Sequence, residues 1–289
     1  MAEVSVPAAV PAGPGRLPGT GQMLAAQVRY QLLLLVRSPR GMVISLVVPL
    51  LLLVLSSSRH GHLDTFTEDA LVAGLGAFGL IVTAYVSNAI TLVTSRQEGV
   101  LRRWRATPLP AWCFFGGKIA ATALMGLASV AIAVAAGAAL YGVRLTGATA
   151  LSLLITFTLG VLAWAAIGIA VTTLVPTAMS AGPVLMVTYL PVILFSGGLG
   201  SLNSEPGWLA TLGRYLPAQP VIEAATRALQ HTASRTGGGL VLVSGRELAV
   251  LAAWAAAGVI LSVCFFRWDP VRPRHSGAAS QAGRRRGPA

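Results

Sequence analysis

The sequence contains few charged residues. Only 10% of its 289 residues are charged, whereas soluble globular domains carry about 25%. Hydrophobic residues make up 55% of the chain, and several apolar runs approach or exceed the roughly 20 residues that a helix needs to cross a bilayer. The composition therefore excludes an ordinary soluble domain and predicts an all-α integral membrane protein.

The residues that usually carry chemistry are also scarce. The two cysteines, Cys113 and Cys264, are too far apart in the sequence to suggest a metal site, and we expect no structural disulfide. His60 and His62 form a close pair, but two such ligands in a loop are more often solvated than bound to metal. The one lysine, Lys118, is followed by isoleucine, so the sequence lacks the Lys-Ser/Thr pair of a P-loop. We therefore expect no catalytic, metal or cofactor site in this chain.

Six apolar segments are predicted to cross the membrane as helices. The preceding segment, residues 22–36, has a helical pattern interrupted by Arg29 and is too short to span, so we expect an amphipathic helix in the membrane interface. A disordered tail is predicted over 1–21, a six-span domain over 22–268, and a basic disordered tail over 269–289. The six spans cover about residues 41–56, 70–94, 112–141, 148–175, 178–195 and 248–266.

The charges that flank these spans predict their orientation. The insert after the second span, counted together with Lys118, carries a net charge of +4, and the tail from Arg267 carries +5. The loop over 59–69 carries −2. Positive charge collects on the cytoplasmic side of a membrane protein. We therefore expect the insert and both termini in the cytoplasm, in a multi-pass protein of the plasma membrane.

The insert itself, residues 95–108, is a short charged stretch between two long apolar runs. Ser95 and Glu98 have the spacing of a capping box, which predicts a helix start at Ser95, and Pro108 ends the helix about three turns later. One interpretation is a basic helix lying on anionic headgroups. The other is a docking helix for a soluble partner, with an apolar face of Val100, Leu101 and Trp104 and a rim of Arg102, Arg103 and Arg105.

The segment after the fifth span, residues 196–245, is too apolar for a solvated loop and too interrupted for a span. Two short amphipathic helices are predicted, from Pro206 to Tyr215 and from Val221 to Leu229, dipping into the outer leaflet. Non-helical backbone at that depth must be buried in protein, so the segment caps the outer end of a pathway or packs at a subunit contact. The alternative is an anchor in the membrane interface. The candidate gate residues are Phe195, Ser196, Gly197, Gly198, Pro206, Trp208, Leu209, Pro217 and Pro220.

A stripe of polar residues lies on the second span. It includes Ser87, Asn88 and Thr91. Polar side chains within a span either form hydrogen bonds between helices or mark a substrate pathway. The sequence leaves both interpretations open.

The order of these parts resembles the permease subunit of type-2 ABC exporters, the family that includes bacterial daunorubicin-type drug exporters. The resemblance covers about residues 22–268, and three motifs carry it. They are Glu98-Gly99-x-Leu101-Arg102 closing on Ala106-Thr107-Pro108, then Phe195-Ser196-Gly197, and finally Pro206-x-Trp208-Leu209 followed by Leu216-Pro217 and Pro220.

The resemblance implies a coupling helix after the second span, docked on a separate ATPase subunit that uses ATP and Mg²⁺. It also implies paired re-entrant helices after the fifth span, and an assembly of two permeases, identical or paralogous, with two ATPases. The coupling helix would comprise Glu98, Gly99, Val100, Leu101, Arg102, Trp104, Arg105 and Pro108.

The function expected from these features is export of a hydrophobic or amphipathic substrate, such as a drug-like compound, a lipid or a glycolipid. Membrane lipids would be further partners, and nucleic acid would not. An ion-coupled secondary transporter is one alternative, but such carriers need intramembrane carboxylates or histidines, and the predicted spans hold none in their interiors. A structural membrane subunit without transport activity is the other.

Overall fold

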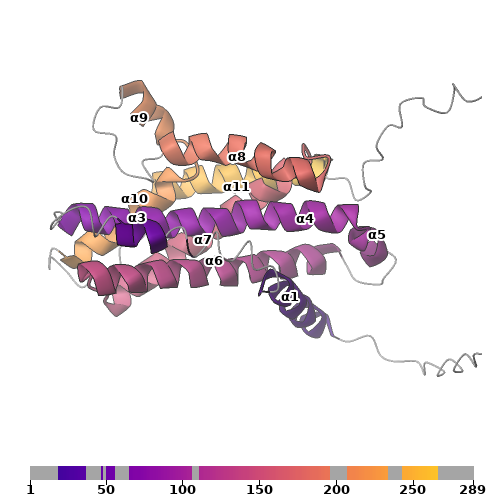
Figure 1. The fold of residues 1–289 in the computed structure, drawn as a ribbon, viewed down its shortest axis with the longest axis horizontal. Helices are drawn as coiled ribbons and strands as arrows, with labels where there is room; N and C mark the ends of the chain where they lie inside the picture. The colour runs from indigo at the N-terminus through magenta and orange to yellow at the C-terminus, as the bar shows by residue number, and fades with distance from the viewer. Residues whose placement is uncertain are drawn as a thin grey trace, which may run out of the picture.

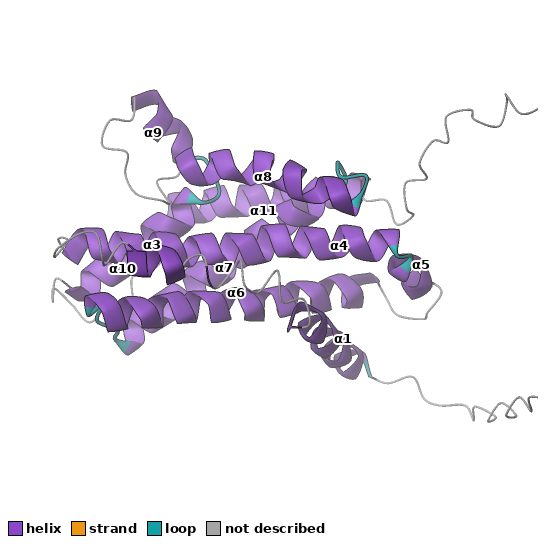
Figure 2. Ribbon diagram, in the orientation of Figure 1, coloured by secondary structure: helices purple, strands orange, loops and turns teal. Residues whose placement is uncertain are grey.

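The structure, a computed structural model, describes residues 19–36, 47, 50–55, 65–105, 111–195, 207–233 and 243–265. Within these ranges the regular elements are helices, with no strand (Figures 1 and 2), which confirms the predicted all-helical class. Most of the first predicted span, 41–56, and of both predicted tails lies outside the described residues. The count of six spans therefore stays a prediction. Five described segments are long and apolar enough to cross a membrane: Thr67–Gln97, Trp112–Tyr141, Gly147–Val171, Ala178–Phe195 and Gly245–Phe265.

The central element is one long helical rod made of α3 (Thr65–Ile81), the π-helix η1 (Val82–Ser87) and α4 (Asn88–Gln97). It begins before the predicted boundary at residue 70, so Asp69 lies within the helix and is buried. The π-turn widens the rod where α7 crosses it. A Cβ added to Gly168 of α7 would lie 3.1 Å from the carbonyl oxygen of Tyr85, so a larger residue here would require the two backbones to separate slightly.

The core of the bundle forms where α6 (Ala111–Tyr141) and α7 (Gly147–Val171) pack against the rod. Small residues let these helices approach closely, as expected for helix packing in lipid. Trp164 and Tyr85 meet edge to face, with ring centroids 5.6 Å apart. The chain reverses between the two helices at Gly142, whose positive φ of 70° favours glycine.

The helices α8 (Ala178–Phe195) and α11 (Gly245–Phe265) lie at the periphery and expose most of their surface. α11 packs on α7 at Gly258, where an added Cβ would lie 2.7 Å from the carbonyl carbon of Ala166. The outward faces of both helices are apolar. They are therefore suited to contact lipid or another subunit.

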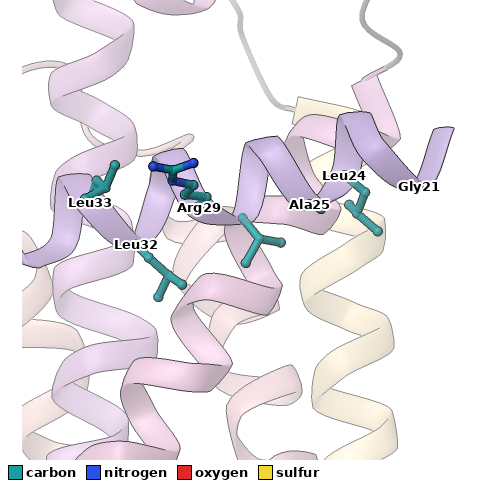
Figure 3. A pocket seen from close by; sticks show the side chains of 7 residues that line it. Gly21, Leu24, Ala25, Arg29, Leu32 and Leu33 are labelled. Carbon is teal, nitrogen blue, oxygen red and sulfur yellow. The ribbon is translucent and has the colours of Figure 1, made fainter. Parts of the chain in front are cut away.

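The helix α1 (Thr20–Val36) lies across α6, close to the end of the bundle that carries the short helix α5 (Figure 1). Its side chains Gln27 and Gln31 are buried, while Tyr30 and Leu34 are exposed. The predicted helix is confirmed. Its glutamines face the bundle, and its exposed surface is rich in apolar side chains. A shallow groove follows α1 and is lined by Gly21, Leu24, Ala25, Val28, Arg29, Leu32 and Leu33 (Figure 3).

Two further helices, α9 (Gly207–Gly213) and α10 (Gln219–Ala233), lie at the end of the bundle opposite α5 (Figure 1). The prediction of two short helices here is confirmed. α10 is longer than predicted and carries Pro220 near its start, where proline needs no hydrogen-bond partner. It packs against α3 and α7 rather than lying apart from the bundle.

Candidate functional site

The helix break after the second span is where the candidate coupling helix begins. α4 continues through Ser95 to Gln97, so the predicted helix start at Ser95 is wrong. The amide of Glu98 still donates to the carbonyl of Thr94, at 2.9 Å. Gly99 then adopts a φ of 69°, which ends the helix. The helix-ending glycine is a signal that sequence reasoning could have used in place of the capping box.

The short helix α5 (Val100–Arg105) packs against the bundle through Leu101. This side chain is 0% exposed and lies among Leu92, Phe114 and Ile169, which belong to α4, α6 and α7. The prediction that Leu101 faces a partner is therefore wrong, because its side chain is buried within the permease itself. α5 is thereby fixed to three spans at once.

Other residues of the predicted docking helix lie on the outward side of α5 or at the break before it. Val100 is half-buried, and Glu98 and Arg103 are exposed. Arg103 Nη2 donates to the carbonyl of Glu98 at 3.3 Å, across the helix break. The predicted side chains of Arg102, Trp104, Arg105 and Pro108 lie outside the described residues.

Arg96, in the last turn of α4, reaches the end of α7. It is 2% exposed. Its Nη1 donates to the carbonyl of Thr172 at 3.2 Å, and its Nη2 donates to the carbonyl of Val175. The last carbonyls of a helix lack partners within the helix, and a cation is favourable there. In the sequence, Arg96 contributes only to the net charge of the insert, because the predicted span ends at residue 94.

The turn between α7 and α8, residues 172–177, is attached to α4 a second time. Gln97 Oε1 accepts a hydrogen bond from the backbone amide of Ala178, at 3.0 Å. Apolar side chains beside this turn face outward, with Leu174 73% exposed and Met179 93% exposed. α5 and this turn therefore lie at the same end of the bundle (Figure 1).

The predicted polar stripe faces the interior of the bundle. Asn88 is 1% exposed, and its side-chain oxygen and nitrogen have no hydrogen-bond partner among the described residues. The Thr91 hydroxyl donates to the carbonyl of Ser87 at 2.9 Å and accepts from Lys118 Nζ at 2.8 Å. Thr91 thus joins α4 to α6, as the hydrogen-bonding interpretation requires. A role in a substrate pathway stays a prediction.

At the opposite end, the candidate gate residues fall into two groups. Trp208 on α9 is 68% exposed, and Phe195 is exposed at the end of α8. Pro217 and Pro220 are buried where α10 begins. Four of the predicted residues lie outside the described ranges, as does the side chain of Leu209: Ser196, Gly197, Gly198 and Pro206.

Polar contacts and burial fix α10 in place. Arg227 of α10 forms an ion pair with Glu247 of α11, and Glu223 pairs with Arg246 at 3.2 Å. Glu223 and Arg227 of α10 therefore bind α11. Glu247 also accepts from the amide of Ser244 at 2.8 Å, which forms a capping box at the start of α11. The buried face of α10 consists of Val221, Ile222, Ala224, Ala225, Ala228 and Leu229.

α9 is attached more lightly than α10. Trp254 Nε1 of α11 donates to the carbonyl of Tyr215 at 2.8 Å, and Gly213 packs against the end of α8, where an added Cβ would lie 2.4 Å from the carbonyl oxygen of Phe195. The side chains of Trp208 and Tyr215 are exposed. α9 therefore rests on the ends of two peripheral helices.

Comparison with known proteins identifies the family. The model of the family described as "ABC-2 type transporter" matches residues 22–229. Two curated proteins of Escherichia coli, from strain K12 and from O157:H7, are each 24% identical over 147 residues, and both are named "Probable multidrug ABC transporter permease YbhR". The match covers 51% of this chain and 39% of each relative's length. With its membrane-spanning helices, the chain therefore belongs to the ABC-2 type transporter family, as a multi-pass membrane permease.

Proposed function

We propose that this permease is the membrane half of an ATP-driven exporter and receives its energy through α5 from a separate ATPase subunit. The observation that carries this proposal is the burial of Leu101 against α4, α6 and α7. A load applied to α5 would reach three spans through one packed side chain. ATP and Mg²⁺ would be bound by the ATPase, and no cofactor by this chain.

The proposed docking surface combines α5 with the turn between α7 and α8. Exposed apolar side chains at the end of a helical bundle commonly mark an interaction site, and here Leu174 and Met179 supply them. Glu98 and Arg103 would form a polar rim. Burying each large apolar side chain would contribute about 1.5–3 kcal/mol, which suits a contact that must form and rearrange in each transport cycle.

We place α5 and both termini in the cytoplasm. The net positive charge of the insert and of the C-terminal tail supports this orientation. α9 and α10 would then form the outer end, as re-entrant helices. An impermeant thiol reagent applied to intact cells should label Trp208→Cys but not Arg103→Cys, in a background lacking Cys113 and Cys264. Labelling of Arg103→Cys from outside would contradict this orientation.

The outer end is proposed to have a fixed part and a moving part. α10 is held by ion pairs to α11 and by its buried apolar face. The described attachments of α9 include those at Gly213 and Tyr215, and its Trp208 side chain is exposed. We therefore assign release of the substrate to movement of α9, and the proposed joint, residues 196–198, lies outside the described residues.

A hydrophobic or amphipathic substrate is proposed, within an assembly of two permeases and two ATPases. The apolar interior of the bundle and the printed name of the relatives, which includes "multidrug", support a drug-like compound. Such an activity would confer drug or antibiotic resistance. Lipids and glycolipids share the required chemistry.

The experiment uses ethidium, an amphipathic cation, as the probe. The chain would be co-expressed with an ABC ATPase that co-purifies with it, and inverted membrane vesicles would be prepared. ATP-dependent ethidium uptake that requires both proteins is the expected result. Uptake driven by a proton gradient, without the ATPase, would overturn the proposal.

One observation favours the ion-coupled alternative. Asp69 is buried within a membrane-spanning segment, and its Oδ2 has no hydrogen-bond partner among the described residues. A buried carboxylate is the kind of group that binds a coupling ion. Loss of uptake in Asp69→Asn, together with independence from ATP, would favour this alternative over the ATP-driven exporter.

A further inference from the structure

The guanidinium of Arg96 lies where the end of α4 meets the turn between α7 and α8. The family match does not assign a role to this side chain. Arg96 comes three residues before Gly99, where the backbone turns with a φ of 69° into α5. Its Nη1 and Nη2 donate to the carbonyls of Thr172 and Val175, which lie one turn apart at the end of α7. One side chain therefore connects the start of the coupling segment to the turn between α7 and α8.

This contact uses the geometry of arginine. A guanidinium presents several donors in a planar fork, so it can bind two carbonyls at once. Its charge also suits the negative end of a helix dipole. Burying a cation beside uncharged partners carries a desolvation cost, and a simpler helix contact would not require it. We expect such a group to be retained because the position of the two joined segments matters.

The neighbouring residue strengthens the same connection. Gln97 Oε1 accepts from the amide of Ala178, on the far side of Pro176. Residues 96 and 97 therefore hold both ends of the α7–α8 turn. On the other side of Gly99, Leu101 anchors α5 to the bundle.

We propose that Arg96 is a positioning residue that clamps the α7–α8 turn to α4, so that this turn and α5 form one rigid surface and move together. The consequence for ATP coupling depends on the proposed function. The clamp itself is a property of the permease alone. Without it, α5 and the turn would move independently, and a load on one would no longer displace the other.

The test measures distances in the full-length permease, reconstituted in nanodiscs without any partner. Cys113 and Cys264 are first replaced by alanine and serine. Spin labels are then attached to Arg103→Cys on α5 and Leu174→Cys on the turn, both exposed positions. A reference pair, Leu124→Cys and Leu154→Cys, reports on α6 and α7 away from the clamp.

We expect one narrow distance distribution for the 103–174 pair when Arg96 is present. Arg96→Met should broaden this distribution about twofold by releasing a hinge-like motion, without broadening the 124–154 distribution. Arg96→Lys, which can still donate to a carbonyl, should restore part of the narrowing. If Arg96→Met yields no folded protein, Arg96→Gln takes its place; its shorter side chain cannot bridge the carbonyls of Thr172 and Val175, so the same broadening is expected.

Two results would overturn the proposal. An unchanged 103–174 distribution would show that the turn is held without Arg96. Equal broadening of both pairs would show that Arg96 supports the bundle as a whole. Since no ATPase or substrate is used, failure of the clamp is distinguished from failure of the proposed transport function.

Discussion

The ammonium of Lys118 on α6 donates to the hydroxyl of Thr91 on α4, at 2.8 Å. Lys118 is 5% exposed, and Thr91 is the hydrogen-bond partner that the structure gives it. The Thr91 hydroxyl would still donate to the backbone if the ammonium were removed. The contact therefore joins two helices at the expense of a buried charge.

Replacing Lys118 should show how much the burial of its charge destabilises the fold. Lys118→Met keeps an unbranched apolar stem and removes the buried charge and its desolvation cost, so we expect an increase in stability. Thermal unfolding of the purified permease measures it as a higher Tm. Lys118→Arg, which keeps the charge, is the control and should give no increase. A lower Tm in Lys118→Met would show that the ammonium is a net stabilising group.

Glycine at the contact between α11 and α7 should be irreplaceable. A Cβ at Gly258 would lie 2.7 Å from the carbonyl carbon of Ala166, and backbone atoms cannot move aside as a flexible side chain can. We expect Gly258→Ala to separate the two helices and lower the Tm. Gly182→Ala is the matched control, because nothing lies within 4 Å of its added Cβ. It should be neutral or stabilise α8 by up to about 1 kcal/mol. Equal effects of the two substitutions would contradict the close packing.

Truncation of Leu101 should destabilise the permease itself. Removing a buried leucine side chain costs about 2–5 kcal/mol, and Leu101 is enclosed by Leu92, Phe114 and Ile169. We therefore expect Leu101→Ala to lower the Tm of the isolated permease without any ATPase present. Val100→Ala, at a half-buried position of the same helix, should have a smaller effect. A Tm unaffected by Leu101→Ala would restore the hypothesis of an exposed docking residue.

A cross-link between α7 and α10 should leave export intact. The hydroxyls of Thr149 and Thr232 form a hydrogen bond, so cysteines at these positions are close enough to be joined. If α10 is fixed during transport, ATP-dependent ethidium uptake should persist after cross-linking.

The double variant Gly197→Pro and Gly198→Pro, which stiffens the proposed joint before α9, should insert and bind the ATPase yet fail to export. Loss of uptake in the cross-linked protein alone would show that α10 moves.

Hydrophobicity and charge alone predicted much of this fold. The apolar runs located five described spans, and glycine and proline located the breaks around α9 and α10. These features depend on local composition, since a span must be apolar whatever it packs against. The charge pattern likewise gave an orientation, which stays a prediction.

The errors at the candidate site arose where neighbouring elements decide the outcome. The orientation of a helix as short as α5 depends on the pocket that receives Leu101, and that pocket comes from three distant segments. The contacts of Arg96 and Arg227 were not predicted, because their partners, the carbonyl of Val175 and the carboxylate of Glu247, lie far along the chain or beyond a helix break. Side-chain partners of this kind cannot be deduced from spacing along one helix.

Co-purification of the ATPase with docking-surface variants tests the central claim most directly. Met179 and Leu174 are exposed at the end of the bundle that carries α5, so an aspartate at either position should not disturb the core. We expect the double variant Leu174→Asp and Met179→Asp to retain the wild-type Tm and to recover at least about tenfold less ATPase, as for loss of an interface hot spot. Met179→Leu, which stays apolar, should recover the normal amount. Undiminished recovery of the ATPase with the double variant would contradict the proposal that this end of the bundle receives the energy for transport.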